Sequence, residues 1–138
     1  MFNKIAIFGV GLIGGSFALA LKQAGAVAHV TGMGRSAASL LRARELGILD
    51  SIGHSAAEAV EGADLVLIAA PVAQTEFILD SIAPHLRPGT IVTDAGSTKT
   101  DVVAAARKAL GQKIAWFVPG HPIAGRESNG PEAAIPDL

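Results

Sequence analysis

Two short segments of the chain combine residue types that can carry chemistry. Near the amino end, Gly9, Gly11 and Gly14 form a Gly-x-Gly-x-x-Gly pattern directly after an apolar run. Near the carboxyl end, His121 stands in a turn-forming segment between prolines and glycines. A glycine turn that opens a helix brings backbone N–H groups to a pyrophosphate, and a neutral imidazole accepts a proton from an alcohol. Together these segments predict a dinucleotide cofactor that faces a proton-accepting histidine.

Each glycine of the pattern has a separate expected role. Gly9 lets the chain reverse, Gly11 lets the backbone approach a pyrophosphate, and Gly14 lets helix and strand pack closely. Leu12 and Ile13 lie between these glycines and are expected at the cofactor as well. The pattern follows a strand, opens a helix and lies inside a βαβ unit, which is the context of a true match. A packing turn without a ligand is the alternative.

The residues after the second expected strand bear on which dinucleotide is bound. NAD sites usually carry an acidic residue about 20 positions beyond the glycines. This chain instead has Gly34, Arg35 and Ser36 there, with no carboxylate to repel a 2′-phosphate. Arg35 can fork onto such a phosphate and Ser36 can donate to it, so the sequence favours NADP over NAD. In the alternative interpretation, Ser36 only caps the next helix and Arg35 is solvated.

The elements that must position these residues are short apolar runs alternating with segments of helical period, which is typical of βαβ units on a parallel sheet. The expected strands are Lys4–Phe8, Val27–Thr31, Leu65–Ala69, Thr90–Thr93 and Ala115–Val118. The expected helices are Leu12–Ala24, Ser36–Leu46, Val72–Ile82 and Thr98–Leu110. The fold class is therefore α/β, a doubly wound and mostly parallel sheet of the Rossmann-like type. Ala70 and Pro71, which follow a uniformly apolar strand, are expected to contact the cofactor.

Two polar segments follow later strands and so reach the same carboxyl edge of the sheet, where doubly wound folds bind ligands. Ser97 is a candidate for bonding a substrate hydroxyl or the nicotinamide, and a helix cap is its alternative role. Lys99 lies in the first turn of an expected helix, where it opposes the helix dipole, and this unfavourable placement indicates a contact with an anionic substrate. His121 follows the last expected strand, while the other three histidines are expected to be structural.

The composition limits the classes of protein to consider. The 138 residues suffice for one domain, which we expect to span residues 1–138. A net charge of −1, no Tyr and one Trp give no reason to expect nucleic acid or a membrane surface as a partner. The lack of cysteine removes thiolate metal sites and nucleophiles and fits the cytoplasm, and no metal site is expected. The apolar run 5–21 imitates a secretory signal, but its glycines would break the required helix.

Three segments taken together identify a family resemblance. GVGLIGGS at 9–16, DAGSTK at 94–99 and GHPIAG at 120–125 resemble the prephenate dehydrogenase family, which includes arogenate and cyclohexadienyl dehydrogenases. The segment from His121 to Glu127 is specific to this family, and the resemblance covers essentially the whole chain. It implies oxidative decarboxylation of prephenate or arogenate with hydride transfer to NAD(P)+, in tyrosine biosynthesis.

The resemblance also implies roles for single residues. His121 would bond the ring hydroxyl of the substrate, and Ser97 would help to place that hydroxyl and the nicotinamide. Glu127 would lie near the entrance of the active site, where a carboxylate steers or gates the substrate. Arg35 departs from the family pattern, because many members carry Asp near this position.

Family members continue into a helical domain that completes the substrate site and forms a homodimer. This chain stops at Leu138, so we expect that domain to be absent and the chain to bind nucleotide but turn over poorly alone. Two alternatives stay open. One is an oxidoreductase of the β-hydroxyacid dehydrogenase or imine reductase type, and the other is a non-catalytic nucleotide-binding sensor.

Overall fold

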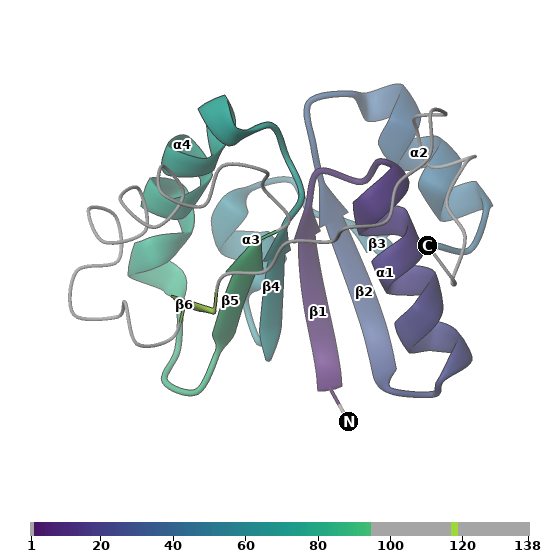
Figure 1. Cartoon of the computed structure of the whole chain (residues 1–138), viewed down its shortest axis with the longest axis horizontal. Helices are drawn as coiled ribbons and strands as arrows, with labels where there is room; N and C mark the ends of the chain where they lie inside the picture. The colour runs from purple at the N-terminus through teal and green to yellow at the C-terminus, as the bar shows by residue number, and fades with distance from the viewer. Residues whose placement is uncertain (1, 95–116, 119–138) are drawn as a thin grey trace.

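The computed structural model of the chain describes residues 2–94 and 117–118. Within these ranges, six parallel strands form one sheet in the order β3-β2-β1-β4-β5-β6 (Figure 1). The strands are β1 (Phe2–Phe8), β2 (Val27–Met33), β3 (Ser51–Ile52), β4 (Leu65–Ile68), β5 (Ile91–Asp94) and β6 (Phe117–Val118). The helices are α1 (Leu12–Gln23), α2 (Ala37–Glu45), α3 (Ala56–Val60) and α4 (Val72–Ile82), followed by a 3-10 turn at Ala83–His85.

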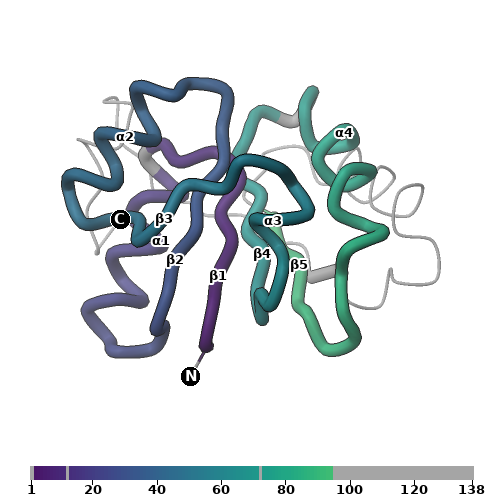
Figure 2. The backbone as a smooth tube through the Cα atoms, turned by 180° about the vertical axis from the view of Figure 1, so that it is seen from behind, coloured from purple at the N-terminus to yellow at the C-terminus, as the bar shows by residue number. Residues whose placement is uncertain are grey.

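The central strands are buried on both faces, as the uniformly apolar sequence of β4 indicates. Alternate residues of β1 point to opposite faces and join different hydrophobic clusters. Ile5 and Ile7 pack with residues of α1 and α2, whereas Ala6 and Phe8 pack with residues of α3 and α4. Helices therefore cover both sides of the sheet (Figures 1 and 2), and the doubly wound fold class is confirmed.

The order of the strands creates one point where the chain changes direction across the sheet. From β1 it moves outward to β2 and β3, then crosses to the other side of β1 to form β4, β5 and β6. In parallel doubly wound sheets, ligands bind at this switch point, outside the carboxyl ends of the strands. In Figure 1 this edge is the upper one, opposite the amino end of β1.

The expected elements agree with the structure to within about two residues, except for one omission. The segment between α2 and β4 contains β3 and α3, which are not among the expected elements. β3 has only two residues and pairs with β2 at Thr31 and Gly32, so it is too short to show a strand period. The helix expected at Thr98–Leu110 and the first two residues of the strand expected at Ala115–Val118 lie outside the described residues.

The amino edge of the sheet is closed by polar contacts. Asp64 accepts from the backbone N of Asn3 at 2.6 Å and from Nη2 of Arg87 at 2.7 Å. Nζ of Lys4 donates to the carbonyl oxygens of Glu58 at 3.3 Å and Glu61 at 2.8 Å, at the carboxyl end of α3. None of the helices in the described part of the chain is long and apolar enough to cross a membrane.

Candidate functional site

Gly9 occupies the point where three strands meet. Its backbone N donates to the carbonyl oxygen of Met33 at 2.8 Å, and its φ of +93° lies in the left-handed region. A Cβ at this position would lie 2.8 Å from backbone atoms of Ala69 and Ala70. Only glycine therefore fits the reversal between β1 and α1, as the sequence predicted.

Gly14 and Gly11 differ in what surrounds them. A Cβ on Gly14 would lie 2.5 Å from the carbonyl oxygen of Gly9 and 3.1 Å from Cγ2 of Ile7, so Gly14 allows α1 to pack closely on β1. A Cβ on Gly11, by contrast, would meet nothing within 4 Å. Gly11 is thus not required for packing, and its backbone faces open space, which fits the expected approach of a pyrophosphate.

The amino ends of α1 and α4 lack the side-chain caps that α2 and α3 have. Ser36 and Ser55 accept from the third backbone N–H of α2 and α3, at 3.2 and 3.1 Å. α1 begins after Gly11 and α4 after Pro71, and neither residue makes such a bond. Free N–H groups at the amino end of a helix attract anionic groups such as phosphates.

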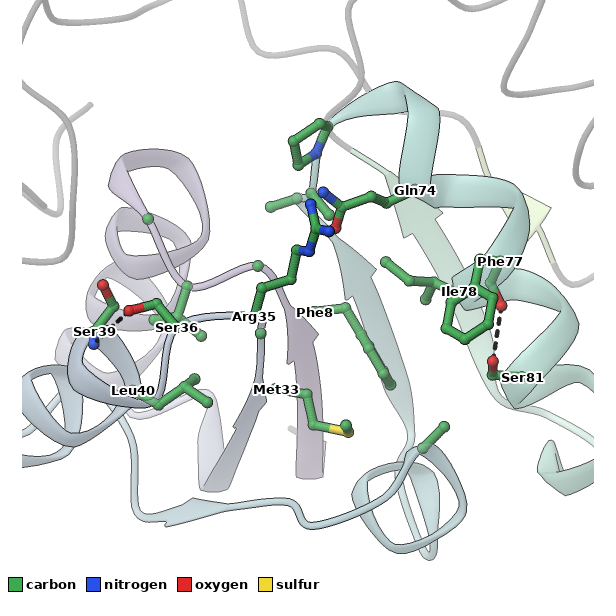
Figure 3. Close-up of a pocket in the computed structure, with 18 of the residues that line it drawn as sticks. Phe8, Met33, Arg35, Ser36, Ser39, Leu40, Gln74, Phe77, Ile78 and Ser81 are labelled. Atoms are coloured by element: carbon green, nitrogen blue, oxygen red, sulfur yellow. Dashed lines mark hydrogen bonds between the residues drawn. The ribbon is translucent and has the colours of Figure 1, made fainter.

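A pocket of about 680 Å³ lies at the switch point, beside these two helix ends (Figure 3). It is formed by the carboxyl ends of β1 and β2, by the residues that follow β1, β2 and β4, and by residues of α2, α3 and α4. Its apolar lining includes Phe8, Met33, Ala56 and Ile78. A largely apolar cleft with a few polar groups is typical of small-molecule sites.

The pocket brings together most of the predicted cofactor residues that the structure describes. These are Gly9, Gly11, Arg35, Ser36, Ala70 and Pro71. Gly14 lies beneath the turn in the helix contact, and Ile13 is half-buried and does not line the pocket. Leu12 is the first residue of α1, and its side chain lies outside the described part. Contact of these three residues with a cofactor stays a prediction.

Arg35 is the one charged side chain among the described residues that line the pocket. It is exposed, makes no ion pair with any residue in the described ranges, and points across the pocket mouth (Figure 3). Ser36 caps α2, because its Oγ accepts from the backbone N of Ser39. Capping this helix is the alternative role that the sequence offered for Ser36. The hydroxyl proton of Ser36 is not used in that bond, so the cap does not prevent donation to a phosphate.

The wall that α4 contributes to the pocket was not predicted from the sequence. Gln74, Phe77, Ile78 and Ser81 line the pocket and are spaced as one helical face, at i, i+3, i+4 and i+7. That spacing was readable in the sequence. The side chains on this face of α4 are partly polar and partly apolar. Such a mixture does not indicate whether the face lines a cavity, faces solvent or packs in the core.

The other predicted site residues, Ser97, Lys99, His121 and Glu127, lie outside the described residues. Asp94, which precedes this group in the chain, ends β5 and is buried. Among the described histidines, the ring of His29 bonds Oγ of Ser51 at 2.8 Å, within the sheet. No group of three His, Asp or Glu side chains in the described ranges is placed to hold a metal ion.

The parallel sheet, the glycine turn and the pocket at the switch point define a Rossmann-like nucleotide-binding domain. Comparison with known proteins identifies the family. Residues 17–138 match the family described as prephenate dehydrogenase, nucleotide-binding domain, and the chain belongs to this family.

Curated relatives match almost the whole chain. The cyclohexadienyl dehydrogenase of Zymomonas mobilis subsp. mobilis is 38% identical over 138 residues, which are 100% of this chain and 46% of the relative. The prephenate dehydrogenase of Lactococcus lactis subsp. cremoris is 38% identical over 136 residues, which are 96% of this chain and 37% of the relative. The chain thus spans less than half the length of these relatives.

Solved structures agree with these matches. A crystal structure of prephenate dehydrogenase from A. aeolicus in complex with hydroxyphenyl propionate and NAD+ has a TM-score of 0.88 and 34% identity, covering 99% of this chain and 47% of that one. Synechocystis arogenate dehydrogenase has a TM-score of 0.82 and 30% identity, covering 95% of this chain and 45% of that one. An imine reductase from Pseudomonas sp., at 23% identity and a TM-score of 0.66, shares the fold.

Proposed function

We propose that this chain is the NAD(P)-binding part of a dehydrogenase that oxidatively decarboxylates prephenate or arogenate. The observation that carries the proposal is the switch-point pocket, where the glycine turn, two uncapped helix ends and Arg35 meet. The turn and the helix ends suit a pyrophosphate, and the apolar part of the pocket suits the remainder of a nucleotide. When bound, the nicotinamide accepts a hydride from the substrate.

We further propose that NADP is preferred to NAD. No carboxylate lines the described part of the pocket, where an acidic residue on the ribose would repel a 2′-phosphate. Arg35 has no competing partner in the described ranges, and Ser36 keeps a hydroxyl proton to donate. The Aquifex relative was crystallised with NAD+, so the choice of cofactor needs a direct test.

For the reaction itself, we propose the roles that the sequence pattern and the family resemblance imply. The imidazole of His121 accepts the proton of the ring hydroxyl while hydride leaves the carbon that bears it. Ser97 positions that hydroxyl, Lys99 attracts the anionic substrate, and Glu127 stands at the entrance. Loss of carbon dioxide then makes the ring aromatic, which provides driving force, so the protein mainly positions its substrate and accepts one proton. We expect the enzyme to act as a homodimer.

Titration with both dinucleotides tests the cofactor site. We expect calorimetry to show tighter binding of NADP+ than of NAD+. Arg35→Ala should weaken NADP+ binding by about 10- to 100-fold, because a charge-assisted contact contributes roughly 1.5–3 kcal/mol. The same change should affect NAD+ much less. Arg44→Ala is the matched control, since Arg44 is also exposed and lies on α2 outside the pocket.

Each other result has a distinct meaning. An equal loss for NADP+ and NAD+ in Arg35→Ala would show that Arg35 contacts a group common to both cofactors and would overturn its assignment to the 2′-phosphate. Binding of neither dinucleotide to the unchanged, folded chain would mean that the glycine turn serves only for packing. The proposed function would then fail.

A further inference from the structure

Gln74 places a free amide at the mouth of the pocket. It lies in the first turn of α4, where its backbone N donates to the carbonyl oxygen of Pro71 at 2.9 Å. Its side chain points towards Arg35, which comes from the opposite wall (Figure 3). The side-chain amide forms no hydrogen bond with any residue in the ranges 2–94 and 117–118. It therefore offers one acceptor and a neighbouring donor to a ligand.

Two hydroxyls of the pocket each make one hydrogen bond within the protein. Oγ of Ser81 donates to the carbonyl oxygen of Phe77 at 2.8 Å, within α4. Oγ of Ser36 accepts the capping bond at the start of α2. Gln74 thus differs from both in having its donor and its acceptor unused by the described protein.

Gln74 also borders the apolar part of the pocket. Phe8 and Met33 come from β1 and β2, Ala56 from α3, and Ile78 from the next turn of α4. These four side chains make this part of the pocket apolar. A flat heteroaromatic ring has apolar faces and a polar edge, and it suits a pocket with an apolar interior and an amide at its mouth.

We propose that Gln74 selects the adenine base of the cofactor by pairing its amide with the N6/N7 edge of the base. This inference rests on the proposed NAD(P) site. Oε1 accepts from the N6 amino group and Nε2 donates to N7, a bidentate pattern that glutamine makes with adenine. A base with a carbonyl at position 6 presents two acceptors on this edge. Oε1 then faces an acceptor and one contact is lost.

The test compares NADP+ with nicotinamide hypoxanthine dinucleotide phosphate, which replaces the amino group by a carbonyl. Dissociation constants of both are measured by calorimetry on the unchanged chain, Gln74→Met and Gln23→Met. Methionine keeps the length of glutamine without its hydrogen bonds. Gln23 is the matched control because it is exposed at the end of α1 and does not line the pocket. We expect the unchanged chain and Gln23→Met to prefer NADP+ by about 10-fold, and Gln74→Met to bind both equally.

The readout is the ratio of the two dissociation constants measured on the same protein. A general loss of stability in a variant affects both constants alike and leaves their ratio unchanged. Equal binding of the two dinucleotides to the unchanged chain would overturn the inference and leave the proposed cofactor site intact. A 10-fold preference that survives in Gln74→Met would also overturn it, by assigning base selection to other residues. If neither dinucleotide binds to the unchanged chain, the proposed function fails and the inference fails with it.

Discussion

At the scale of single residues, Asp64 joins three segments at the edge of the sheet opposite the pocket. Its carboxylate accepts from the backbone N of Asn3 and from Arg87, and its own backbone N donates to the carbonyl oxygen of Lys4 at 2.9 Å. The hydrogen bond from Asn3 and the charge of Arg87 hold the pKa of Asp64 below its ordinary value of 3.8, although burial acts in the opposite direction. The folded state therefore favours the charged form.

This lowered pKa predicts a dependence of stability on pH. A carboxylate whose pKa is lower in the folded chain stabilises it fully above the unfolded pKa, about 3.9, and loses this effect as pH falls through the folded pKa. Asp64→Asn should therefore lower the melting temperature at pH 7. It should also flatten the fall in melting temperature between pH 5 and pH 3. Thermal unfolding followed by circular dichroism measures both.

Asp80→Asn is the matched control, since Asp80 is exposed on α4 and pairs with no residue in the described ranges. Part of the acid sensitivity should remain in Asp64→Asn. The pKa of Asp50 is also lowered, because hydrogen bonds from Val30 and Lys22 outweigh the effect of burial. Identical pH profiles for Asp64→Asn and the unchanged chain would contradict the assigned role of Asp64.

At the scale of elements, two glycines at the turn between β1 and α1 have different roles: Gly14 serves helix packing, and Gly11 is expected to serve cofactor binding. Gly11→Ala should change the free energy of unfolding by at most about 1 kcal/mol, since its Cβ meets nothing within 4 Å and an N-cap alanine has a modest cost. Gly14→Ala should cost about 1–3 kcal/mol, because its Cβ would lie 2.5 Å from a backbone oxygen. We expect Gly11→Ala nevertheless to weaken dinucleotide binding at least about 10-fold, by obstructing approach to the uncapped helix end.

Urea denaturation and calorimetry on the same two variants measure both quantities. Unchanged cofactor affinity in Gly11→Ala would show that ligands do not approach this backbone. A large loss of stability in Gly11→Ala would instead show that the turn is tighter than the open space around Gly11 indicates.

The elements differ in how far the sequence predicts them. β4 was evident because its uniformly apolar run has few alternatives to a strand covered on both faces. β3 was not, because its two residues form a strand only where β2 offers partners at Thr31 and Gly32. The start of α3 had a local signal in Ser55 and Glu58, whose side chains accept backbone N–H groups at the helix start.

The same distinction holds for the site. The glycines and Arg35 are readable because their conformation and charge act locally. Gln74 is not, because which face of α4 borders the pocket depends on how the helix packs against the rest of the fold. Residues 95–116 and 119–138 carry the predicted catalytic side chains, and their roles rest on the sequence pattern and the family resemblance.

At the scale of the whole molecule, we expect the isolated chain to bind the nucleotide without catalysing the dehydrogenation. The described lining of the pocket runs from Phe8 to Ser81, and we expect this region to contribute much of the nucleotide affinity. The relatives are more than twice as long as the matched segment, and the family resemblance places part of the substrate site in their additional length. We therefore expect the 138-residue chain to bind NADP+ while showing no measurable turnover of prephenate or arogenate.

A chimera tests whether the chain supports turnover when it is joined to the remaining part of a relative. When this chain replaces the matching segment of the Zymomonas mobilis cyclohexadienyl dehydrogenase, NADPH formation should appear and NADP+ affinity should stay within about threefold of that of the isolated chain. His121→Asn in the chimera should lower kcat by about 100-fold or more without changing the NADP+ dissociation constant, because general base catalysis contributes at least about that factor. Turnover by the isolated chain would contradict the separation of binding from chemistry. An active chimera that is indifferent to His121→Asn would remove His121 from the proton transfer and leave this chain a nucleotide-binding module whose catalytic base lies elsewhere.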